Sequence, residues 1–142
     1  MKRIIICLVC AMSVLALVPT ASGAIKITRI QFDSPAADNG SNASRNAEWI
    51  RLRNTGDAAR ALTGWRVRDA AGHLYVFGTY TLAAGKTVTI HTGSGSNTAR
   101  HRYWGSGSYI WNNDGDTARL RRPNGTLVDV CSYSGAGSVV NC

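Results

Sequence analysis

The sequence predicts an all-β domain, either a sandwich or a barrel, and three observations carry this prediction. Short runs alternate apolar with polar residues, as strands with one buried face do. Turn-forming residues separate these runs about every 8 to 12 residues. No window repeats its apolar residues with the period of an α-helix. The clearest runs begin at Trp49 and Trp65, and each alternates apolar residues with arginines.

Apolar alternation places the individual strands. The polar segments 34–46 and 92–107 are predicted to be loops, and the Gly/Ser-rich residues after 133 a tail. Tight turns are predicted at residues 113–115 (Asn-Asp-Gly) and 123–125 (Pro-Asn-Gly). The predicted strands are, in order, residues 25–32, 48–54, 65–69, 73–77, 87–91, 109–111, 118–121 and 127–133.

The first predicted strand contains an irregularity. Its apolar residues change parity halfway, so a regular strand would turn half of them outward. A β-bulge near Thr28 and Arg29 removes this conflict, and bulges suit edge strands. The predicted core includes Ile50 and Leu52 of the second strand, and Leu62 in the bridge that follows it. It also includes Trp65, Val67, Val88, Ile90, Ala118 and Leu120.

Residues 1–24 have the pattern of a secretory signal peptide. A basic start at residues 1–3 precedes an almost continuous apolar run at 4–18, and small residues at 22–24 fit a cleavage site. A transmembrane anchor is the alternative, but the run is shorter than the roughly 20 residues that span a bilayer. We therefore expect one secreted domain over residues 25–142, located outside the cell or in the cell envelope, without an integral membrane span.

Two of the four cysteines, Cys7 and Cys10, lie in this predicted signal peptide. Cys131 and Cys142 remain, an even pair in a chain predicted to be exported. Oxidising compartments keep such pairs closed, so we predict a disulfide that pins the C-terminal tail.

The chain is basic, with 16 Lys and Arg against 8 Asp and Glu and a net charge of +8 at pH 7. After residue 24 the basic residues are arginines, apart from Lys26 and Lys86. Such a surface favours polyanions or an acidic cell envelope as partners. A soluble protein with a compositional preference for arginine is the alternative interpretation.

The order of several motifs along the chain resembles the lamin tail domain family. Residues 48–56 read Glu-Trp-Ile-x-Leu-x-Asn-x-Gly, and residues 62–69 read Leu-Thr-Gly-Trp-x-Val-x-Asp. Gly-x-x-Tyr-x-Phe follows at 72–77, and Leu-x-x-Gly-x-x-Val-x-Ile-x-Thr-Gly at 82–93. The resemblance extends over residues 25–133 and is to the bacterial exported form of the domain.

This resemblance implies an immunoglobulin-like β-sandwich that binds or tethers rather than catalyses. In bacteria such domains often accompany secreted nucleases or other hydrolases, and no such partner domain is visible in this sequence. The chain also has no heptad-repeat rod, and Cys142 is the last residue rather than four from the end, so a prenylation box is absent.

Three Arg-apolar-Arg triplets are the candidate ligand-binding feature. Strand geometry places both arginines of a triplet on one face, opposite the apolar residue. If neighbouring strands carry the pairs, they merge into a basic stripe that can bind phosphates of DNA, RNA or anionic wall polymers. An ordinary solvated sheet face that discourages edge pairing is the alternative. The candidate residues are Arg51, Arg53, Arg66, Arg68, Arg119, Arg121 and Arg122.

Tyr103, Trp104 and Tyr109 form a second candidate, an aromatic patch in a region that also carries Arg100 and Arg102. Aromatic faces can stack on sugars or bases. The residue types fit better with a cap on one end of the sandwich, with the polar ends of the side chains in water.

No pattern predicts catalysis, a cofactor or a metal site. The three histidines are far apart in the sequence, and no nucleophile motif accompanies them. Residues 112–116 resemble half of a calcium loop but lack a bidentate glutamate, so a turn explains them. A weak calcium site at Asp114 and Asp116 stays open.

We therefore expect a secreted, non-catalytic binding or scaffolding module that is monomeric and takes polyanions as partners. Two alternatives remain at this point. One is a structural envelope protein that self-associates through strand edges. The other is an accessory module of a secreted hydrolase or nuclease system.

Overall fold

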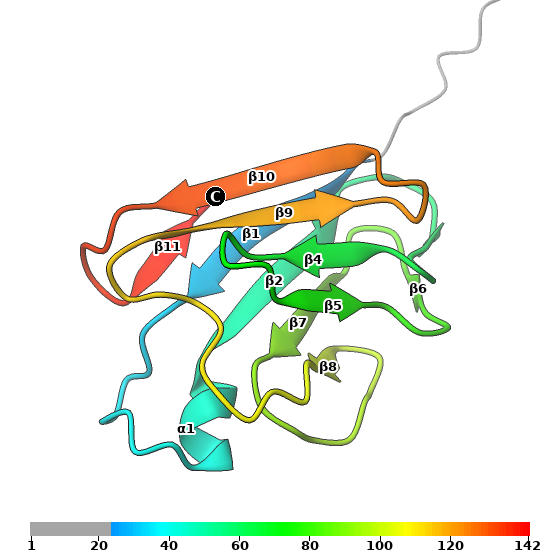
Figure 1. The fold of residues 1–142 in the computed structure, drawn as a ribbon. Helices are drawn as coiled ribbons and strands as arrows, with labels where there is room; N and C mark the ends of the chain where they lie inside the picture. The colour runs from blue at the N-terminus through cyan, green and yellow to red at the C-terminus, as the bar shows by residue number, and fades with distance from the viewer. Residues whose placement is uncertain (1–23) are drawn as a thin grey trace, which may run out of the picture.

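The computed structural model describes residues 24–142 and folds them into two facing β-sheets (Figure 1). The larger sheet has five strands in the order β11-β1-β2-β7-β8. Neighbouring strands in this sheet are antiparallel, except β7 and β8, which run parallel. The strands are β1 (Ile25–Gln31), β2 (Trp49–Asn54), β7 (Thr87–His91), β8 (His101–Tyr103) and β11 (Val139–Asn141).

The second sheet has four strands in the order β10-β9-β4-β5 and lies in front of the first in Figure 1. All its neighbours are antiparallel. A short two-stranded sheet and one helix complete the fold. The second sheet consists of β4 (Arg66–Arg68), β5 (Leu74–Val76), β9 (Asp116–Arg121) and β10 (Leu127–Tyr133); the remaining elements are β3 (Arg60–Ala61), β6 (Thr81–Leu82) and α1 (Asn42–Ala47).

The core lies between the two sheets and is built by strand alternation. Ile50 and Leu52 of β2 are fully buried, as are Val67 of β4 and Leu120 of β9. Leu62, in the bridge between the sheets, is also fully buried. The predicted core and the predicted sandwich are therefore confirmed. Within residues 24–142, no helix has the length and apolar character needed to cross a bilayer.

The predicted bulge in the first strand is confirmed. The pairing of β1 with β2 shifts between Ile27 and Arg29, so the apolar residues on both sides of the shift point into the core. The suggestion that this strand lies at an edge is wrong, because β11 pairs with its outer side from Arg29 to Gln31. The Gly/Ser-rich tail after residue 133, in which no strand was predicted, thus supplies β11.

A second correction concerns the predicted loop at residues 34–46. It ends in the helix α1, whose N-cap Ser41 accepts a hydrogen bond from the Ser44 amide at 3.1 Å. Such a cap satisfies one of the free amides of the first turn. The helix has six residues, too few to show an apolar period in the sequence.

Two further predictions are corrected between residues 92 and 111. The predicted loop 92–107 contains β8, which has no apolar alternation to reveal it. Residues 109–111 were predicted to form a strand and do not, because the amides of Ile110 and Trp111 bond to the carboxylate of Glu48. The predicted signal peptide lies outside the described residues, apart from Ala24.

Candidate binding faces

The structure brings four of the predicted arginines together on the outer face of the four-stranded sheet. Arg66 pairs with Arg121, and Arg68 pairs with Arg119, across the neighbouring strands β4 and β9. The buried residues between them, Val67 and Leu120, force the arginines outward. We call Arg66, Arg68, Arg119 and Arg121 the arginine quartet.

The arginine quartet consists of two directly opposed pairs of like charges. Side chains opposite each other on antiparallel strands have Cβ atoms about 5 Å apart, where like charges repel. None of the carboxylates of residues 24–142 lies within ion-pair distance of any of the four guanidinium groups. Arg121 donates one hydrogen bond to the Gly125 carbonyl at 2.9 Å. The quartet therefore concentrates positive charge that the described part of the chain does not neutralise.

Arg51 and Arg53 are not part of this group, because β2 belongs to the other sheet. Their neighbours on β1 are Arg29 and Lys26, which pair with Arg51 and Arg53. The Arg51 guanidinium lies 4.6 Å from the centre of the Trp49 ring, a cation–π contact. Only β4 and β9 therefore meet the condition for a merged stripe, and Arg51 and Arg53 lie on the opposite outer face.

Arg122 lies apart from both faces. It follows β9, and its guanidinium lies 5.9 Å from the ring of Trp65 at the end of the sandwich. The alternation that turns Arg121 outward turns Arg122 toward this largely buried tryptophan. Its contact is therefore with the rim of the core.

The structure separates the three residues of the predicted aromatic patch. Trp104 packs on the core beside Tyr75 and Trp111, with ring centres 5.7 and 6.0 Å away. Tyr103 stacks on His91 at 5.1 Å. The Tyr109 hydroxyl lies 2.6 Å from Ser44 Oγ of α1. The placement of Trp104 is that of a cap on the sandwich end.

A histidine pair brings together residues that are distant in the sequence. His91 Nε2 lies 2.9 Å from His101 Nδ1, across the parallel strands β7 and β8. Because the Asn46 carbonyl can only accept, the 2.8 Å contact to it requires a proton on His91 Nδ1. Burial, assisted by the neighbouring His101, lowers the pKa of His91, although the bond to Asn46 opposes this shift. This shift favours the neutral form of His91.

The residues that suggested half of a calcium loop hold a turn together. Asp116 Oδ1 accepts hydrogen bonds from the amides of Ala70 and Thr117, and Oδ2 accepts one from the Asn112 amide. Across residues 24–142, no three His, Cys, Asp or Glu side chains gather as a metal site would need. These hydrogen bonds satisfy both oxygens of the buried Asp116 carboxylate without a metal ion.

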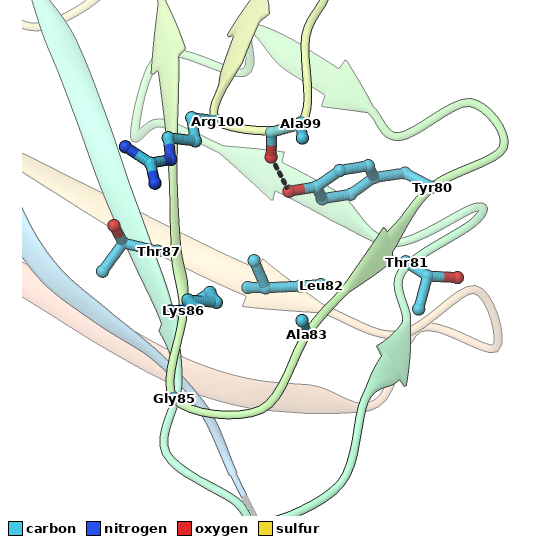
Figure 2. Close-up of a pocket in the computed structure, with 9 residues that line it drawn as sticks. All are labelled: Tyr80, Thr81, Leu82, Ala83, Gly85, Lys86, Thr87, Ala99 and Arg100. Atoms are coloured by element: carbon cyan, nitrogen blue, oxygen red, sulfur yellow. Dashed lines mark hydrogen bonds between the residues drawn. The ribbon is translucent and has the colours of Figure 1, made fainter.

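A cavity of about 440 Å³ lies between β6 and β7 (Figure 2). Leu82 points into it, and Tyr80 closes one side, with its hydroxyl donating a hydrogen bond to the Ala99 carbonyl at 2.7 Å. Lys86 and Arg100 are the cations of its lining. Sequence reasoning did not find this cavity, because residues 80–87 and 99–100 meet only in the folded chain.

Two facing sheets with a buried apolar core and outward-facing arginines define an immunoglobulin-like β-sandwich. The lamin tail domain family model matches residues 18–135. The chain therefore belongs to the lamin tail domain family, a family of non-enzymatic immunoglobulin-like domains. A search of curated proteins found no match.

Proposed function

We propose that the protein is an exported, non-catalytic binding module that holds polyanions on the arginine quartet. It acts at the cell envelope or outside the cell. The observation that carries the proposal is the pairing of Arg66 with Arg121 and of Arg68 with Arg119, with no carboxylate of the described residues at ion-pair distance.

The repulsion within the arginine quartet lowers the stability of the free protein, and a bound anion would remove this repulsion. Like charges directly opposite each other on neighbouring strands are destabilising. A phosphate or carboxylate between two guanidinium groups accepts forked hydrogen bonds and removes the repulsion. An extended polyanion can satisfy both pairs at once, which favours polymers over single small anions.

The test is retention of the exported protein on heparin and on duplex DNA across a salt series. Each arginine–phosphate contact contributes about −0.9 to the slope of log affinity against log salt. We expect the double variant Arg68→Gln/Arg119→Gln to make this slope for DNA less steep, by about 2 in magnitude. Its thermal stability should stay unchanged or rise, because a repulsive pair is removed.

The matched control is Arg51→Gln/Arg53→Gln, which removes the same charge from the other sheet. We expect it to leave retention close to that of the unchanged protein. Equal losses in both variants would show that net charge, not the arginine quartet, binds the polymer. Elution of the unchanged protein at or below physiological salt would reject the proposal.

A further inference from the structure

Every large apolar side chain that is exposed among residues 24–142 borders the arginine quartet. There are four: Leu74 and Val76 on β5, 48% exposed each, and Leu127 and Val130 on β10, 46% and 45% exposed. Single exposed apolar residues need no explanation, but their concentration on one face does.

The strand register sets these residues in two parallel rows. Arg68 and Arg119 stand between Leu74 and Val130 in one row. In the other, Arg66 and Arg121 stand between Val76 and Leu127. Each row therefore reads apolar, arginine, arginine, apolar across the four strands. The bulge between Leu127 and Asp129 keeps both rows complete, since it turns Leu127 and Val130 to the same side.

A nucleic acid would use only part of this face. Phosphates match the guanidinium groups, but the four border residues are aliphatic and offer no ring on which a base can stack. Tyr75, the aromatic residue between Leu74 and Val76 on β5, belongs to the core and is 8% exposed. On the outer face of the other sheet, by contrast, the Trp49 ring lies beside the Arg51 guanidinium.

We infer that the polyanion held by this face is the surface of a lipid bilayer rich in anionic headgroups. Headgroup phosphates carry the negative charge that would neutralise the arginine quartet, and each arginine near such a surface strengthens binding. The aliphatic borders and the arginine stems can enter the zone between headgroups and acyl chains, as the apolar side of an interfacial helix does. This inference rests on the proposed function, because it uses the same arginines, and it narrows the class of polyanion.

The test is co-sedimentation of the exported protein with vesicles at physiological salt. One set of vesicles is pure phosphatidylcholine, and the other contains phosphatidylglycerol as the anionic lipid. We expect sedimentation with the anionic vesicles and not with the zwitterionic ones. Arg68→Gln/Arg119→Gln should weaken the binding by more than about tenfold, since each basic residue contributes several-fold.

The distinguishing variant is Leu74→Thr/Leu127→Thr, which shortens the apolar border on both sides and keeps strand-compatible residues. We expect about tenfold weaker vesicle binding, from the lost apolar area, with unchanged heparin and DNA retention. Val139→Thr, on the outer face of the other sheet, is the matched control. It should change neither vesicle binding nor retention on heparin and DNA. Thermal unfolding of each variant confirms that the fold is retained.

Other outcomes separate this inference from the proposed function. Retention on heparin without binding to anionic vesicles would overturn the lipid surface and leave polyanion binding standing. Loss of both would overturn both. Vesicle binding that the apolar variant does not weaken, or an equal loss on vesicles and DNA, would show that the apolar borders do not select lipid.

Discussion

Glu48 is the buried carboxyl that organises one end of the sandwich. It is 1% exposed, and its Oε1 accepts hydrogen bonds from Thr92 Oγ1 at 2.6 Å, the Ile110 amide at 2.8 Å and the Trp111 amide at 3.2 Å. Burial raises the pKa of Glu48 to about 7 from its usual 4.5, although these hydrogen bonds oppose the shift. One side chain therefore anchors residues 110–111 and titrates near neutral pH.

Glu48 should make the fold less stable as the pH rises from about 4.5 to about 7. The folded state holds this proton more tightly than the unfolded state, so the contribution is complete below the unfolded pKa and is lost as pH passes the folded pKa. The shift corresponds to about 3 kcal/mol. Urea unfolding at several pH values should show this loss in the unchanged protein relative to Glu48→Gln. Parallel pH profiles of the two proteins would contradict the prediction.

Trp104 is the residue that closes the same end from outside. Because its ring packs against Tyr75 and Trp111, Trp104→Ala should lower the free energy of unfolding by about 2 to 3 kcal/mol. Thermal and denaturant unfolding measure this loss. Tyr103→Phe keeps the stack on His91 and should stay within about 0.5 kcal/mol. A stable Trp104→Ala protein with weakened ligand binding would instead support a ligand-stacking role.

The strand β11 is stabilised by pairing and by a disulfide rather than by an apolar pattern of its own. It has three residues, and it pairs with β1 at Arg29, Ile30 and Gln31. The Cys131–Cys142 disulfide ties the end of β11 to β10, which belongs to the other sheet. This short strand thereby pairs with the otherwise open edge of β1, and its disulfide links the two sheets.

Removing the disulfide should release β11 before the rest of the fold. It joins residues 11 apart, a loop whose closure stabilises by about 3 kcal/mol in the chain-entropy model. We expect Cys131→Ser/Cys142→Ser to lose about that much free energy of unfolding. Amide exchange at residues 139–141 should accelerate, while β2 and β7 remain protected. Unchanged protection of β11 would show that pairing with β1 alone suffices.

For the whole molecule, the open strand edges decide whether copies associate. The edge strands β5, β8 and β11 have three residues each, which offers little backbone for pairing. The long edge strand β10 is irregular at its bulge, and its Asp129 accepts a hydrogen bond from the Ile27 amide at 2.8 Å. The edges of the described sheets are thus short or obstructed.

We therefore expect a monomer. Light scattering of the protein should give the mass of one chain at every concentration, because residues 24–142 offer no long regular edge for strand addition. A mass that rises with concentration would favour the structural, self-associating envelope protein. Activity found only together with a secreted hydrolase or nuclease would favour an accessory module.

Much of the fold could be predicted because strand alternation is local. Ile50, Leu52, Val67 and Leu120 are buried, and their neighbouring arginines point outward, as the two-residue period requires. The elements that were missed are those stabilised by partners rather than by pattern. β8 and β11 are three-residue strands held by β7 and β1, and α1 is a six-residue helix held by its cap.

The sequence by itself determined the class of fold, the core, the cysteine pair and the arginines that lie outside, because each follows from alternation or composition. Only the tertiary structure decided which arginines meet. Strand order brings β4 and β9 together and places β2 in the other sheet, so the candidate arginines divide into a quartet, a separate pair and Arg122. The same register places Leu74, Val76, Leu127 and Val130 beside that quartet, since residues distant in the sequence become neighbours only through strand pairing.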